Sequence, residues 1–241
     1  MACIFFESEK HILSINDRNQ IVALYAVYFG LEVDMIVLSA DALDLTAGTM
    51  TILGTTTILS TNKKTSKGSK KRKRDVTMSV DVFSVFDALV DLASEPYIST
   101  VAFMACHLTE EGGCVLGRAC GDRVACVSLL DCCSFKETLC VGLHELLHTL
   151  GFDHCNSWQC VLNATGDAPW LYLSPVNLSK LKHMHSIPIK DNIFVLKRYN
   201  SLLPLVEGLD SHTGSNGGGG EFQVEKEWLN QRIQSMHALG L

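Results

Sequence analysis

The segment 144–154 constrains this chain more than any other, because it spaces three histidines around one glutamate and one glycine. It reads His-Glu-Leu-Leu-His-Thr-Leu-Gly-Phe-Asp-His. Residues four apart on an α-helix share one face, so His144 and His148 can bind one metal ion together. Gly151 can adopt the left-handed conformation that ends a helix, and the turn can return His154 to the same ion. The segment predicts a three-histidine metal site at the end of a helix.

Glu145 gives this predicted metal site a chemical function. The pattern H-E-x-x-H-x-x-G-x-x-H is typical of zinc peptidases. Three neutral histidines leave the fourth position of a tetrahedral zinc ion to water, whose pKa the metal lowers. Glu145 lies next to the first ligand and would act as the general base. We expect a zinc metallopeptidase that hydrolyses peptide bonds with zinc-activated water; a metal-free buried helix is the alternative.

The composition is that of an ordinary globular protein with an uneven charge distribution. The 241 residues are 47% hydrophobic and 19% charged, enough for one large domain or two small ones. Segment 63–74 holds 8 of the 20 Lys and Arg, which leaves 12 basic against 26 acidic residues elsewhere. This acidic body argues against binding nucleic acid. No secretory signal and no long apolar run is found, so we expect no membrane association and an intracellular protein with mostly reduced cysteines.

The basic block interrupts the folded pattern. Residues 60–75 combine Ser, Thr and Gly with like charges, so we expect a disordered insertion. Its five consecutive basic residues at 70–74 match a nuclear-import signal, and a plain solvated loop is the alternative. The protein is therefore expected in the cytoplasm, the nucleus or both.

The hydrophobic pattern predicts an α/β fold. Expected strands are 3–6, 31–38, 100–106 and 124–130, with 49–59 a strand or an extended loop. Expected helices are 17–29, 82–93 and one that begins at the capping box Ser134–Glu137 and runs through the metal segment. The opening β-α-β order favours a parallel strand pair.

The same pattern suggests a division of the chain. Residues 1–150 form the expected N-terminal subdomain, and residues 151–208 a smaller C-terminal subdomain with short helices near 176–183 and 194–203. Residues 209–221 are expected to be a glycine-rich linker, and 222–241 a final helix.

Two cysteines after the third histidine give the segment a family resemblance. The run from His154 through Cys155 to Cys160 resembles the archaemetzincins, and especially their eukaryotic-type members. Further similar stretches are 30–33, 114–119, 197–199 and 225–229. The resemblance implies a metzincin-like fold, with a twisted mixed sheet, backing helices, an active-site helix and a small C-terminal subdomain. It also implies a zinc peptidase whose partner is a peptide or protein substrate.

The chain departs from the family at a second metal site. Relatives place two further cysteines where this chain has Ser174 and Asn177, and those four cysteines hold a structural zinc. Neither serine nor asparagine is a good zinc ligand. We therefore expect one catalytic zinc ion and regard Cys155 and Cys160 as a remnant of the structural site. If a structural zinc ion is bound, Cys126, Cys132 or Cys133 would be its substitute ligands.

Other residues have expected roles near the site. By analogy with the family, strand 124–130 would lie beside the active site and pair with an extended peptide; simple sheet packing is the alternative. His107, His183 and His185 are expected at the surface or beside the ligands rather than on the metal. Tyr199 is a candidate donor to an oxyanion.

Three functions remain open on the sequence alone. The first is the active peptidase. The second is a zinc-binding but catalytically weak or inactive peptide-binding protein, suggested by the missing cysteine pair and the charged insertion. The third, a DNA-binding zinc protein, is disfavoured by the acidic body.

Overall fold

The computed structural model describes most of the chain. The described residues are 1–7, 13–52, 55–65, 76–90, 97–121, 123–163, 170–188, 190–213 and 220–241. Their contacts divide into two units, residues 1–14 with 34–151 and residues 15–33 with 152–241. The later border between the units follows residue 151, and the expected division of the chain at residue 150 stays a prediction. The segment 15–33, expected with the N-terminal subdomain, groups instead with the C-terminal residues.

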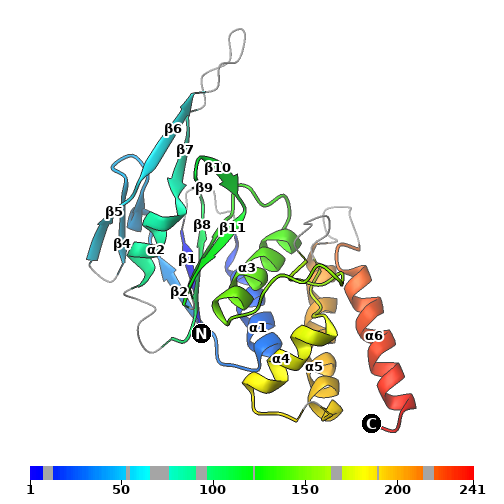
Figure 1. The fold of residues 1–241 in the computed structure, drawn as a ribbon. Coiled ribbons are helices and arrows are strands. Elements are labelled where there is room, and N and C mark those ends of the chain that lie inside the picture. The colour runs from blue at the N-terminus through cyan, green and yellow to red at the C-terminus, as the bar shows by residue number, and fades with distance from the viewer. Residues whose placement is uncertain are drawn as a thin grey trace. The chain divides into compact units, whose positions relative to one another are not determined.

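A five-stranded mixed sheet forms the centre of the first unit (Figure 1). Its strands, in spatial order, are β11 (Gly117–Cys120), β12 (Val124–Ser128), β8 (Thr100–Met104), β1 (Ala2–Phe6) and β2 (Asp34–Leu38). β1 pairs in parallel with β2, as the β-α-β opening predicts, and also in parallel with β8. The apolar residues of β1, β8 and β12 are buried throughout, as expected of central strands covered on both faces.

The position of β12 corrects one prediction. β12 pairs with β8 on one side and with β11 on the other, so its backbone groups are already used. It cannot pair with a peptide, and the sheet-packing alternative holds. β11, antiparallel to β12, is the edge strand of this sheet. Its sequence, Gly-Arg-Ala-Cys, lacks the β-branched and aromatic residues that signal a strand, which is why it was not expected.

The first unit also contains two smaller sheets, helix α2 (Val82–Val90) and the helix that carries the metal segment. One sheet contains β10 (Gly113–Val115), β9 (His107–Glu110), β7 (Val76–Asp81) and β6 (Thr61–Thr65). The other contains β3 (Leu43–Asp44), β4 (Thr49–Ile52) and β5 (Thr55–Ile58), next to the short helix η1 (Ala40–Ala42). Helix α2 buries Val85, Phe86 and Leu89 in the same apolar core as β4 and β8.

The expected disordered insertion is wrong at its first residues. Thr61–Thr65 forms β6, which pairs antiparallel with β7 from Thr61↔Val80 to Thr65↔Val76. Threonine favours extended backbone, and pairing with the partner strand outweighs the polar composition. Residues 66–75, which include the basic run 70–74, lie outside the described residues.

Helices build the second unit. They are α1 (Ile15–Phe29), α4 (Pro175–Met184), α5 (Asn192–Thr213) and α6 (Gln223–Ala238), with α5 in contact with both α1 and α6. Arg198 of α5 is buried, donates from Nε to the Tyr28 carbonyl at 3.0 Å and lies 4.2 Å from the centre of the Tyr28 ring. This contact ties α5 to the end of α1 through a charged hydrogen bond and a cation–π interaction. No helix within the described ranges has the length and apolar content needed to cross a bilayer.

The expected linker is wrong at its start, because α5 continues to Thr213. Pro204 lies inside this helix, where its missing N–H normally favours a helix end. Leu202, Val206 and Leu209 are all buried on either side of the proline, and their packing maintains the helix. Residues 214–219, the centre of the expected linker, are not among the described residues.

Candidate metal centre

Helix α3 (Phe135–Thr149) carries the first half of the site (Figure 1). Ser134 is its N-cap and accepts a hydrogen bond from the Glu137 N–H at 3.1 Å, while the Glu137 carboxylate accepts one from the Cys133 N–H. The predicted start of the helix is therefore confirmed. At the other end Gly151 has a φ of +78°, and its N–H donates to the His148 carbonyl. This left-handed residue turns the chain at the point where the spacing requires it.

The three histidines of the segment converge on one point. One ligand nitrogen from each of His144, His148 and His154 lies within 4.8 Å of the others. The Nε2 atoms of His144 and His148 are 3.0 Å apart, and the two rings are inclined at 78°. Both rings are half-buried on α3, whereas His154 is exposed. Three imidazole nitrogens in this arrangement fit a tetrahedral ion such as zinc with one open position.

Glu145 lies one residue from this group in a protected position. Its side chain is only 8% exposed, and burial raises its pKa to about 7. The Arg118 guanidinium and a hydrogen bond from the Ala119 backbone oppose this rise in pKa, while the Glu110 carboxylate adds to it. A carboxyl group with a pKa near neutral pH can both accept and release a proton under physiological conditions.

The edge strand β11 supplies two of these neighbours of Glu145, Arg118 and Ala119. Gly117 lies so close to α3 that a Cβ atom there would be 2.7 Å from Val141 Cγ1 and 3.0 Å from Glu145 Cγ. Arg118 then pairs with Glu110 of β9, with Nε and Oε1 3.0 Å apart. No motif in the sequence predicts a function for Gly117, Arg118 or Glu110. Only the family-like stretch 114–119 pointed to this strand.

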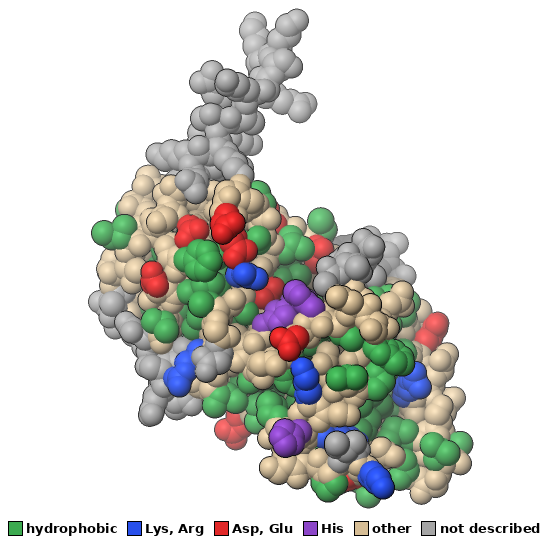
Figure 2. All heavy atoms as spheres, in the orientation of Figure 1, with side chains coloured by type: hydrophobic (Ala, Val, Ile, Leu, Met, Phe, Trp, Pro, Cys, Tyr) green, Lys and Arg blue, Asp and Glu red, His purple; other side chains and the backbone are tan. Residues whose placement is uncertain are grey.

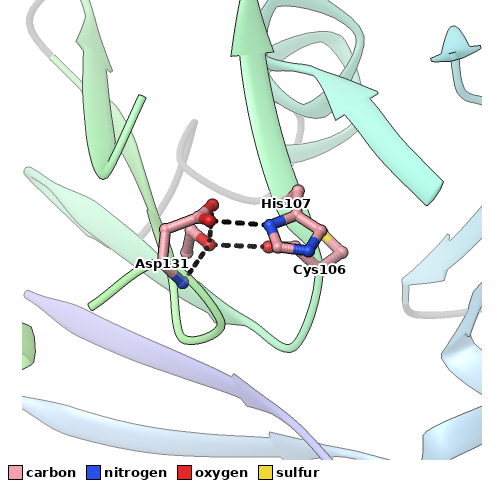
Figure 3. A network of polar contacts seen from close by, with 4 residues as sticks. Cys106, His107 and Asp131 are labelled. Carbon is pink, nitrogen blue, oxygen red and sulfur yellow. Dashed lines mark hydrogen bonds and ion pairs between the residues drawn. The ribbon is translucent and has the colours of Figure 1, made fainter. Parts of the chain in front are cut away.

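His107 takes part in a separate polar network and is not a ligand of the three-histidine group (Figure 3). Its Nδ1 lies 2.6 Å from Asp131 Oδ1. Ser128 Oγ donates to the other carboxylate oxygen of Asp131 at 2.7 Å and lies 2.8 Å from the Cys106 carbonyl. The network holds the loop between β12 and α3 against the start of β9, and so supports the helix that carries the histidines.

The cysteines after His154 form a second cluster. The Cys155 thiol is hydrogen-bonded to the Ser174 side chain and to the Cys160 thiol. Ser174 is also the N-cap of α4, where its Oγ accepts from the Asn177 N–H at 3.2 Å. Ser174 and Asn177 are both buried. The structure therefore brings both cysteines and the first of the two replacement residues together, and that replacement residue caps a helix.

The remaining candidates lie elsewhere. His183 is exposed on α4, and the His185 ring is hydrogen-bonded to the Phe29 carbonyl in the second unit. Tyr199 is 5% exposed and packs edge-on against Trp228, with ring centres 5.2 Å apart. Burial raises the Tyr199 pKa. The described contacts of Tyr199 are packing contacts, and its role as an oxyanion donor stays a prediction.

Comparison with known proteins finds similar solved structures but no matching family model. No protein-family model matches the chain, and no curated protein matches its sequence. Among solved structures, an archaemetzincin from Methanopyrus kandleri is similar at 16% identity and a TM-score of 0.44, over 83% of this chain and 94% of that one. A zinc-dependent peptidase from Methanocorpusculum labreanum is similar at 13% identity and a TM-score of 0.45, over 67% and 87% of the two chains. At these TM-scores and identities, inferences about function depend on the residues of the chain itself.

Proposed function

We propose that this protein is a zinc-dependent metallopeptidase that hydrolyses peptide bonds. The observation that carries the proposal is the convergence of His144, His148 and His154 within 4.8 Å beside the buried Glu145. The three nitrogens would hold the zinc ion. When bound, zinc supplies an activated water and a Lewis acid for the peptide carbonyl.

Glu145 is the general base of the proposed reaction. Its carboxylate takes a proton from the attacking water and passes it to the leaving amine. The carboxyl group is placed for both transfers because it is buried and directly follows the first ligand in the chain. The hydrogen bond from the Ala119 backbone orients the carboxylate, and Arg118 favours its charged form.

The edge strand β11 is the candidate support for the substrate backbone. Among the described strands β11 pairs only with β12, which leaves one of its sides for an extended peptide. β11 also contacts α3 at Gly117, close to Glu145. A peptide paired with β11 would therefore run beside the proposed base.

The test is a cleavage assay on the zinc-loaded chain with a broad peptide library. Wild type should bind about one zinc ion and cleave peptides in a chelator-sensitive manner. Glu145→Gln should retain zinc and lower kcat by roughly 10² to 10⁴-fold. His183→Ala, an exposed histidine outside the group, is the matched control and should cleave like wild type.

Two outcomes of this assay would replace the proposal. Zinc-loaded wild type that binds peptides but cleaves none would establish the inactive, peptide-binding alternative. A wild-type protein that binds no zinc would contradict both the active peptidase and the inactive, zinc-binding alternative.

Nuclear import through the basic run 70–74 is a separate proposal, supported by its five consecutive Lys and Arg residues. A fluorescent fusion with these residues changed to alanine should shift from the nucleus to the cytoplasm. An unchanged distribution would contradict the proposal.

A further inference from the structure

A groove in the second unit has no role in the proposed reaction. It lies between α4, the first turns of α5, and α6, and encloses about 420 Å³. Figure 2 shows hydrophobic side chains gathered over this part of the surface, with Lys or Arg side chains beside them. A volume of this size falls within the range of roughly 300 to 1,000 Å³ typical of small-molecule sites.

Aromatic rings form the walls of the groove. The Tyr172 and Trp228 rings are stacked, with centres 4.6 Å apart and planes inclined at 14°. Trp158 also lines the groove and is 52% exposed. Exposed tryptophan next to stacked rings presents flat apolar surface to solvent, which suits a flat apolar ligand.

Positive charge borders these aromatic walls. The Arg232 guanidinium lies 5.5 Å from the centre of the Trp228 ring and is exposed on α6. Lys182 of α4 lines the same groove, where burial lowers its pKa and the nearby Asp191 opposes that shift. No Asp or Glu side chain is among the described residues that line the groove, although the chain carries a net charge of −6. A guanidinium fixed on an aromatic face is a preferred partner for a carboxylate or another oxyanion.

We propose that this groove binds a small organic anion with a flat apolar body. The body packs against Trp158, Tyr172 and Trp228, and the anionic group pairs with Arg232. Charge complementarity selects this ligand class over a neutral apolar compound, because the lining offers the exposed guanidinium of Arg232 and no acidic side chain among the described residues. The groove would thus be a ligand site independent of the three-histidine group.

The test uses two fluorescent probes that differ in one charged group. 1-Anilinonaphthalene-8-sulfonate carries an anionic sulfonate, and N-phenyl-1-naphthylamine has the same aromatic body without it. The full chain should bind the sulfonate probe at one saturable site, and more tightly than the neutral probe. Arg232→Gln should lower the affinity for the sulfonate probe about tenfold, since it removes one charged hydrogen bond. The affinity for the neutral probe should stay the same.

Two further variants complete the design. Lys197→Gln removes an exposed cation from the same helical unit but outside the groove, and should change neither affinity. Trp158→Ala should lower the affinity for both probes, because it removes apolar contact surface without removing a charge. Equal affinity of wild type for the two probes, or full sulfonate binding by Arg232→Gln, would overturn the proposal. So would the absence of saturable binding.

Discussion

Two clusters of potential metal ligands follow each other along this chain, and they differ in what their side chains already do. In the histidine group, the three imidazole nitrogens of His144, His148 and His154 point to one place. In the cysteine cluster, the two thiols of Cys155 and Cys160 meet the hydroxyl of Ser174. Ser174 is at the same time the cap of α4.

The comparison shows that a complete donor set matters more than the proximity of donors. Both clusters are compact, but only the histidine group offers three strong donors and an open position. In the cysteine cluster the hydroxyl and the Asn177 N–H satisfy a helix terminus, which stabilises a helix by about 1 kcal/mol. The histidine group can therefore bind a catalytic metal ion, whereas the cysteine cluster stabilises the fold.

Removal of one donor from each cluster gives the largest expected difference. His154→Ala should reduce bound zinc from about one ion to nearly none, because a catalytic site needs three protein ligands. Cys155→Ser, one residue away, should leave the zinc content unchanged. Metal analysis of the purified proteins measures both. Equal losses of zinc in the two variants would mean that the cysteines contribute ligands.

Completion of the cysteine cluster should add a metal ion. The double substitution Ser174→Cys and Asn177→Cys would place four thiols around the start of α4, and four cysteines form a closed zinc site. We expect the zinc content to rise from about one to about two ions per chain. A content that stays at one would show that the cluster does not have the geometry of a metal site.

The sequence predicted the histidine group because its geometry is local. Helical spacing places His144 and His148 together, and one glycine turn brings His154, so no distant residue is needed. The capping box at Ser134 is equally local, and the structure contains it.

The surroundings of Glu145 could not be predicted because they come from distant segments. Ala119, Arg118 and Glu110 reach Glu145 only through the pairing of β11 with β12 and the ion pair to β9. Long-range packing also extends α5 through Pro204, although proline favours a helix end. Pairing with β7 likewise makes Thr61–Thr65 a strand, although the polar composition of this segment favours disorder.

The buried Glu145 should make the stability of the metal-free protein depend on pH. Burial raises the pKa of Glu145 from 4.5 to about 7, so the folded state holds this proton more tightly than the unfolded state. The stabilisation is complete below about pH 4.5 and is lost as the pH rises through 7, a change of about 3 kcal/mol. Glu145→Gln should remove this part of the pH dependence. Urea unfolding of wild type and Glu145→Gln at pH 5 and pH 8 measures the effect. The same change in the free energy of unfolding between the two pH values in both proteins would contradict the burial of a titrating carboxyl group.

Close packing of β11 on α3 predicts a smaller effect. Gly117→Ala should lower the free energy of unfolding by about 1–3 kcal/mol, because the new methyl group meets Val141 and the Cys126 carbonyl. Gly113→Ala on β10 is the matched control. A Cβ atom there would meet only the Glu110 carbonyl at 3.4 Å, so it should be nearly neutral. Equal stabilities of the two variants would argue against the tight approach of β11 to the helix.

X-ray absorption spectroscopy at the zinc edge tests the central claim most directly, because it identifies the atoms around the metal. The histidine group predicts three imidazole nitrogens and one oxygen at about 2.0 Å, with no sulfur. Sulfur at about 2.3 Å would contradict the account, because it would place the metal on Cys155 and Cys160 instead of the histidines.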